Sequence, residues 1–156
     1  MRVLLKLNLD CPPDAAWRAI RSPTVFTAVS APFTSFTSLE DDGFPELWPE
    51  GVHPVEVKAA GLIPIGIQTI EIAYPARADG VRTMRDTGRG LTGVLAQVTR
   101  WEHTMALSPA HNGTTLYRDQ LIFEAGRMTP LLWPLYWAFW QWRAIGLRRL
   151  ARGWHS

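Results

Sequence analysis

The chain has 156 residues, of which 47% are hydrophobic and 19% are charged, and its formal net charge is +2. This mixture excludes an intrinsically disordered chain, and the length predicts one domain, spanning 1–156, that can bury a core. The small net charge argues against a nucleic-acid partner, because such binding depends on neutralising many phosphates.

The first strand is predicted over residues 2–9, where apolar and polar side chains alternate. Pro12 and Pro13 end this strand and introduce a short helix over 15–20. Ser22 followed by a proline has the form of a second helix start. Six further strands are predicted over 33–39, 52–60, 65–74, 81–87, 95–107 and 114–124.

The last element is a helix from Thr129 to Arg152, because beyond Gly126 the apolar period changes from two to about 3.6 residues. This order of elements predicts an α+β fold in which sequential strands pair antiparallel. A row with helical spacing is expected to face the sheet, and it consists of Leu132, Tyr136, Phe139, Arg143, Leu147 and Leu150.

Four segments resemble the START-like or SRPBCC superfamily, which includes polyketide cyclases and the plant Bet v 1-like proteins. They are 12–20 (PPDAAWRAI), 62–71 (LIPIGIQTIE), 101–103 (WEH), and 113–123 (GTTLYRDQLIF) followed by the long helix. The resemblance covers nearly the whole chain and implies a helix-grip fold. In that fold a seven-stranded antiparallel sheet wraps around the last helix and leaves a cavity between them. None of the four segments is a catalytic signature. Functions in the superfamily range from lipid or hormone carriage to cyclisation, so the resemblance specifies the fold better than the function.

Gly88, Gly90 and Gly93 have the spacing G-x-G-x-x-G of dinucleotide-binding loops. That motif requires a following helix and an acidic residue about 20 positions later. A strand is predicted after the glycines here, and position 113 is also a glycine. The pattern therefore favours a flexible hairpin loop over a nucleotide site, and such a loop could gate the pocket entrance.

The four histidines, His53, His103, His111 and His155, have no zinc-like spacing, so neither a metal nor a cofactor is expected. Cys11 is the only cysteine, and the alternating, charged N-terminus is unlike a secretion signal. No apolar run reaches the ~18 residues that a membrane-spanning helix needs. A cytoplasmic protein is therefore expected.

His103 has the most informative position among the histidines. If Leu107 pairs with Thr115 in the last hairpin, then His103 lies opposite Asp119. The same register places Met105 opposite Tyr117. A His–Asp pair on an aromatic-lined face could orient an imidazole for acid–base catalysis, or it could be a purely structural polar pair.

The expected ligand-binding residues lie where the strand faces and the helical row meet. Within that set, Arg143 is a candidate anchor for an acidic ligand group, or a partner for Glu71 or Asp119. The full expected lining is Trp101, His103, Met105, Tyr117, Asp119, Leu121, Tyr136, Phe139, Trp140 and Arg143.

Three functions remain open from the sequence. The first is binding of a small lipid-like, aromatic or polyketide-like molecule in the cavity. The second is a cyclase or dehydratase activity in which His103 and Asp119 are the acid–base groups. The third is a membrane-peripheral or assembly role of the C-terminal helix, whose many Trp and Arg side chains suit a membrane interface or a homodimer.

Overall fold

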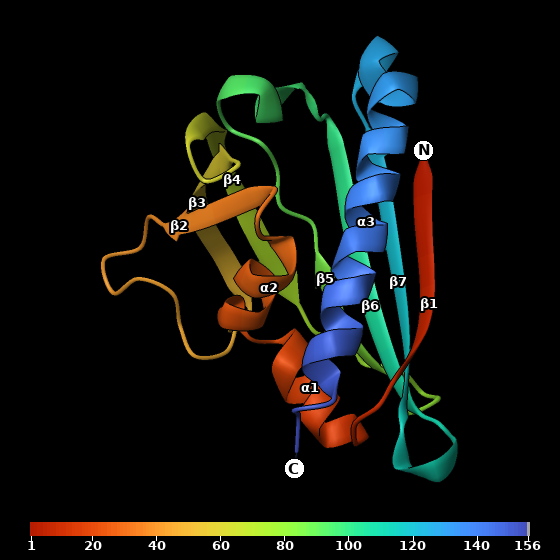
Figure 1. Cartoon of the computed structure of the whole chain (residues 1–156). Helices are drawn as coiled ribbons and strands as arrows, with labels where there is room; N and C mark the ends of the chain where they lie inside the picture. The colour runs from red at the N-terminus through yellow and green to blue at the C-terminus, as the bar shows by residue number, and fades with distance from the viewer. Residues whose placement is uncertain (156) are drawn as a thin grey trace.

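The computed structural model describes residues 1–155 as an α+β fold with one seven-stranded antiparallel sheet (Figure 1). The sheet order is β1-β7-β6-β5-β4-β3-β2. The strands are β1 (Arg2–Leu9), β2 (Thr34–Ser38), β3 (Gly51–Ala59), β4 (Ile63–Ala73), β5 (Arg82–Asp86), β6 (Arg100–Pro109) and β7 (Thr115–Glu124). The helices are α1 (Pro13–Ile20), α2 (Pro23–Ser30) and α3 (Thr129–Ala151), with short 3-10 turns η1 (Gly93–Gln97), η2 (His111–Gly113) and η3 (Gly126–Met128). The predicted fold class and element order are confirmed.

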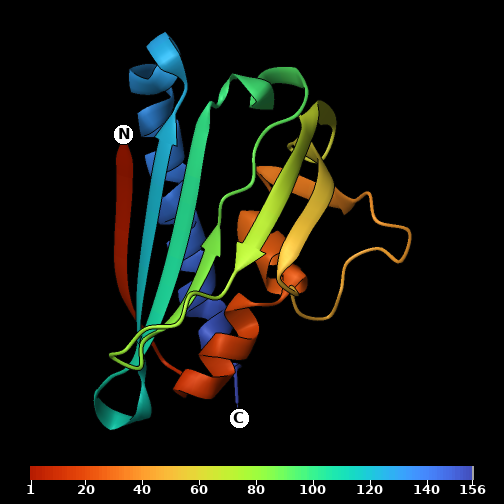
Figure 2. The ribbon, with the colours of Figure 1, turned by 180° about the vertical axis from the view of Figure 1, so that it is seen from behind.

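Helices α2 and α3 lie on the same face of the sheet, and Figure 2 shows the sheet from its other face. Strands β1, β7 and β6 form one half of the sheet beside α3, whereas β4, β3 and β2 lie under α2. Every second residue of β1 and β7 is buried, and this explains the arrangement, because one side of each strand must be covered by the helices. No helix within residues 1–155 is both long and apolar enough to cross a membrane.

The buried side of α3 differs from the predicted row at its C-terminal end. Leu150 is 37% exposed, so its expected contact with the sheet is wrong. The buried positions of the helix are Trp140, Arg143, Ala144, Leu147 and Ala151. Small alanine side chains allow the helix backbone to approach the sheet, and a search for large apolar residues overlooks them.

The register of the β6–β7 hairpin differs from the prediction by two residues. Leu107 pairs with Tyr117 and Met105 with Asp119, so the expected pairing of Leu107 with Thr115 is wrong. Pro109 is the residue that pairs with Thr115, because the ladder continues two residues further toward the η2 turn. A shift by an even number leaves every side chain on its predicted face.

The segment 87–99 is not the predicted hairpin loop followed by a strand. It contains η1 and runs along β4, with Gly90 bridged to Gln68. A Cβ on Gly88 would lie 1.8 Å from the carbonyl oxygen of Thr69, which is a severe clash. The glycine pattern therefore permits close backbone packing of this loop against the sheet.

Candidate functional site

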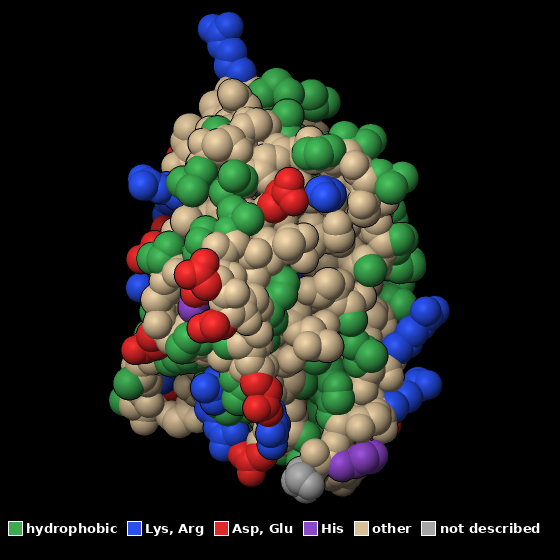
Figure 3. All heavy atoms as spheres, turned by 90° about the vertical axis from the view of Figure 1, so that its left-hand side faces the viewer, with side chains coloured by type: hydrophobic (Ala, Val, Ile, Leu, Met, Phe, Trp, Pro, Cys, Tyr) green, Lys and Arg blue, Asp and Glu red, His purple; other side chains and the backbone are tan. Residues whose placement is uncertain are grey.

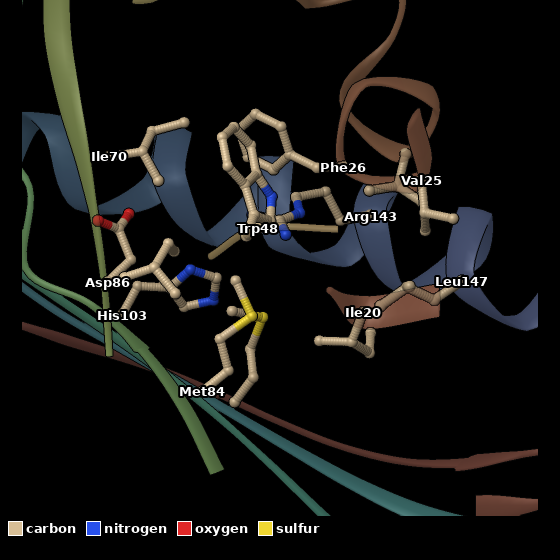
Figure 4. Close-up of a pocket in the computed structure, with 13 residues that line it drawn as sticks. Ile20, Val25, Phe26, Trp48, Ile70, Met84, Asp86, His103, Arg143 and Leu147 are labelled. Atoms are coloured by element: carbon tan, nitrogen blue, oxygen red, sulfur yellow. The ribbon is translucent and has the colours of Figure 1, made fainter. Parts of the chain in front are cut away.

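A narrow cavity of about 30 Å³, measured as the space open to the centre of a water molecule, lies between the sheet, α2 and α3. Most of its wall is apolar, formed by Ile20, Val25, Phe26, Val29, Trp48, Ile70, Ile72, Met84, Met105 and Leu147. Three polar residues complete the wall, namely Asp86, His103 and Arg143 (Figure 4).

Of the ten expected lining residues, the structure brings His103, Met105 and Arg143 together in this cavity. Tyr117, Asp119 and Trp140 lie behind the wall in one hydrogen-bond network with His103. The remaining four residues lie elsewhere. Leu121 belongs to the hydrophobic core. Trp101 and Tyr136 line a separate hollow beside the glycine loop, the segment 87–99 that contains Gly88 and Gly90. Phe139 lines a surface hollow with Phe33 and Trp142.

The network centres on the buried carboxylate of Asp119. Its Oδ1 accepts hydrogen bonds from His103 Nε2 at 2.9 Å and from Trp140 Nε1 at 2.9 Å. Its Oδ2 accepts a third bond from the Tyr117 hydroxyl at 2.5 Å. The predicted contact between His103 and Asp119 is confirmed, although it runs diagonally across the hairpin, because His103 pairs directly with Leu121.

Electrostatics favour the ionised form of Asp119. Burial by itself raises the pKa of this carboxyl, but the charge and hydrogen bond of His103 outweigh it, with smaller contributions from Arg143 and Tyr117. The result is a pKa lowered to about 2. Burial and the adjacent Asp119 charge raise the pKa of the Tyr117 phenol well above its usual value, so this hydroxyl stays protonated and donates.

Asp86 is a second buried carboxyl, at the end of β5. Its Oδ1 accepts from the backbone N–H groups of Glu71 and Gly88, both at 2.9 Å, and its Oδ2 accepts from Trp101 Nε1 at 3.1 Å. Burial raises the pKa of Asp86 in spite of these donors and the nearby His103 charge. The carboxyl therefore fixes the start of the glycine loop at the edge of the cavity.

Arg143 differs from both acids, because its guanidinium is buried without a hydrogen-bond partner among residues 1–155. The residue is 6% exposed, and its Nε is a buried nitrogen that bonds to nothing there. The expected ion pairs of Arg143 with Glu71 or Asp119 do not form within 4.0 Å across the described chain. Its contacts are cation–π contacts, with Cζ 4.9 Å from the Trp140 ring centroid and 5.9 Å from that of Phe26.

Sequence reasoning missed Trp48, Phe26 and the β5 residues of the wall. Trp48 lies in the long segment between β2 and β3, which has no apolar period to assign a face. The side chain is nevertheless 2% exposed and packs edge-on against Phe26. Burial of Trp48 could be foreseen only from its size and type.

The outer face of α3 carries exposed apolar side chains, including Leu131, Leu135 and Trp137. Hydrophobic side chains also follow the right edge of the view in Figure 3, where this helix lies. Membrane contact or homodimer formation through this face stays a prediction. Among residues 1–155, no group of three or more His, Cys, Asp or Glu side chains is placed to hold a metal ion.

No protein-family model and no curated protein matches the sequence. Among solved structures, protein CV1439 from Chromobacterium violaceum is 20% identical with a TM-score of 0.64, covering 97% of this chain and 98% of that one. The Aha1 dimer from Colwellia psychrerythraea is 8% identical with a TM-score of 0.60, covering 97% and 96%. The KanY protein is 12% identical with a TM-score of 0.61, covering 97% of both chains. These likenesses confirm the predicted fold, an antiparallel sheet with two short helices after β1 and a long C-terminal helix packed on the sheet, and at such identities they show the fold alone.

Proposed function

We propose that this protein binds a small, mostly apolar molecule in the cavity between the sheet, α2 and α3. The observation that carries the proposal is the cavity itself, a narrow space with ten apolar and three polar wall residues. Protein interiors are normally close-packed, and an apolar void destabilises the fold in proportion to its volume. A bound molecule that fills this space would recover the lost contacts.

The form of the wall restricts the molecule that fits. Phe26, Trp48 and two methionines, Met84 and Met105, offer flat and adaptable apolar surfaces. Such surfaces suit an aromatic ring system or a short acyl chain, as the sequence resemblance also implies. The narrowness of the space argues against a bulky lipid with two chains.

The test is native mass spectrometry of the protein with whatever molecule co-purifies, compared between two variants of α2. Val25→Phe narrows the cavity, because Val25 is part of its wall. Ala28→Phe adds the same ring on the exposed side of the same helix and serves as the control. We expect the bound molecule with the wild type and Ala28→Phe, and its loss with Val25→Phe. Equal retention in all three would contradict the proposal.

A second candidate function is acid–base catalysis by His103, such as a cyclase or dehydratase reaction. Its support is that Asp119 binds Nε2 of the imidazole, while Nδ1 has no hydrogen-bond partner among residues 1–155. An oriented imidazole with one free nitrogen at a cavity wall is the arrangement that proton transfer requires.

Mass spectrometry of the bound molecule also separates these two functions. If the protein is a dehydratase, the wild type should release its product. The inactive His103→Ala variant should then retain the substrate, which is heavier than the product by one water molecule. A binding protein should carry the same molecule in the wild type and in this variant. An identical bound mass in both therefore excludes the dehydratase.

A further inference from the structure

The guanidinium of Arg143 is an unusual component of an apolar cavity wall. It projects from the buried side of α3 toward Phe26 and Trp48, as Figure 4 shows, and the whole residue is 6% exposed. A buried charge normally has an opposite charge or several hydrogen bonds, because its loss of hydration is otherwise uncompensated. The position therefore raises the question of which group accepts its N–H donors.

The contacts of Arg143 within the protein leave those donors unused. Cation–π contacts with Trp140 and Phe26 act on the faces of the rings and stabilise the charge. The five N–H bonds of a guanidinium lie in its own plane and need acceptors there. Among residues 1–155 none of them finds one, and Nε is also shielded from solvent.

The two buried carboxylates nearby already accept three hydrogen bonds each from other donors. Asp119 accepts from His103, Trp140 and Tyr117. Asp86 accepts from two backbone N–H groups and one indole N–H. Neither acid could turn toward Arg143 without leaving buried donors unpaired, which would be unfavourable. An acceptor for Arg143 therefore comes from outside the chain, and it is either water or a ligand.

We infer that the bound molecule carries one anionic group, a carboxylate or a group of similar geometry, which Arg143 holds through its N–H donors. This inference rests on the proposed binding function and specifies its ligand class. Arginine suits the role because its planar fork binds carboxylates through two parallel hydrogen bonds. The apolar wall then receives the rest of the ligand, so the class is a small aromatic or short-chain acid.

Two further cavity groups fit an elongated acid of this kind. Trp48 Nε1 and His103 Nδ1 are both without a hydrogen-bond partner among the described residues, although both residues line the cavity. Trp48 and Arg143 both contact the Phe26 ring, so the indole N–H is a further donor on the Arg143 side of the cavity. His103 lies 5.2 Å from the Trp140 ring, ring centre to ring centre, and is available to a polar atom farther along the ligand.

The experiment compares 2-naphthoate with 2-naphthamide, which have nearly the same shape and differ in charge. Calorimetric titration gives both affinities, and the methyl signals of Met84 and Met105 report whether the probe enters the cavity. We expect the wild type to bind the acid roughly tenfold or more tightly than the amide, the size of effect that a charge-assisted hydrogen bond gives. Arg143→Met should abolish this preference.

Two further variants make the result specific. Arg148→Met removes an exposed arginine from the same helix and should leave the preference unchanged. Arg143→Lys keeps the charge but loses the planar fork, so an intermediate preference is expected, and this variant stays informative if Arg143→Met folds poorly.

Equal binding of the acid and the amide by the wild type would overturn the inference and leave the proposed function intact. The same holds for a preference that persists in folded Arg143→Met, because another group would then bind the anion. Binding of neither probe, with the methionine methyl signals unmoved, would contradict the proposed function itself.

Discussion

Asp119 and Arg143 are both charged residues buried beside one cavity, but their surroundings are opposite. The carboxylate of Asp119 accepts three hydrogen bonds from side chains of β6, β7 and α3. The guanidinium of Arg143 donates none within residues 1–155 and lies only against aromatic rings. The first charge is fully compensated by the fold, and the second is not.

This difference separates a structural polar group from a group reserved for a ligand. A satisfied buried network fixes the position of its members and makes the native state unique. An unsatisfied buried donor lowers stability in the free protein and recovers that loss when an acceptor arrives. We therefore expect variants of the Asp119 network to affect folding, and variants of Arg143 to affect binding.

Asp119→Ala should produce the largest loss of stability. The substitution leaves three buried donors without an acceptor, and such losses amount to about 1–3 kcal/mol for each unpaired group. Urea denaturation at neutral pH measures the change. Glu46→Ala, which breaks an exposed ion pair with Arg18, is the control and should change the free energy of unfolding by at most about 1 kcal/mol.

The pH dependence of stability should report on the same carboxylate. Because the pKa of Asp119 is lowered from 3.8 to about 2 in the folded protein, its contribution is complete above about pH 4 and is lost as the pH falls toward 2. A shift of this size corresponds to on the order of 2 kcal/mol.

Asp86 must be separated from this effect, because its raised pKa acts in the opposite direction. Its contribution to stability is complete below the unfolded pKa of Asp86 and is lost as the pH rises through the raised folded pKa. The useful quantity is therefore the difference in stability between the wild type and Asp119→Asn. That difference should shrink as the pH falls from about 5 to about 2, and a constant difference would show that Asp119 does not titrate as described.

His103→Ala should have an intermediate effect on stability, about 1–3 kcal/mol, because Asp119 keeps two of its three donors. Melting and probe binding measured on the same variant decide its role. If His103 belongs only to the network, the affinity of the folded variant for 2-naphthoate should stay close to that of the wild type. A large loss of affinity with little loss of stability would place His103 with the ligand-binding groups instead.

Arg143→Met should have the smallest effect on the stability of the free protein, within about 1 kcal/mol of zero. Removing an unpaired buried charge relieves its desolvation, and the lost cation–π contacts and the attraction to Asp119 offset this gain. Thermal unfolding of ligand-free protein is the measurement. A loss as large as that of Asp119→Ala would mean that both charges are structural, and the contrast between them would disappear.

The sequence was sufficient for the faces of the strands but not for their pairing. Period-two alternation assigns His103 and Asp119 to one face whatever the register, because a shift by two residues preserves the face. The register itself depends on how the η2 turn closes, which the turn residues left undecided. The contact between the two side chains survived the wrong register because diagonal neighbours are also within reach.

The cavity wall was harder to predict for two physical reasons. Trp48 comes from a segment without periodic structure, so nothing in its neighbours indicated where it points. Arg143 could be identified as a possible ligand anchor from its place in the helical row. That its guanidinium has no partner depends on where two acids direct their oxygens, which only coordinates reveal.

The most direct test of the central claim is the Nε–H signal of Arg143 in nuclear magnetic resonance spectra of protein with isotope-labelled arginine. The signal of Arg143 is assigned as the one that disappears from the spectrum of Arg143→Lys. We predict a downfield shift of this signal on saturation with 2-naphthoate and no such shift with 2-naphthamide, because only the carboxylate supplies the charged acceptor. An Arg143 signal that stays unchanged while 2-naphthoate fills the cavity would contradict the claim.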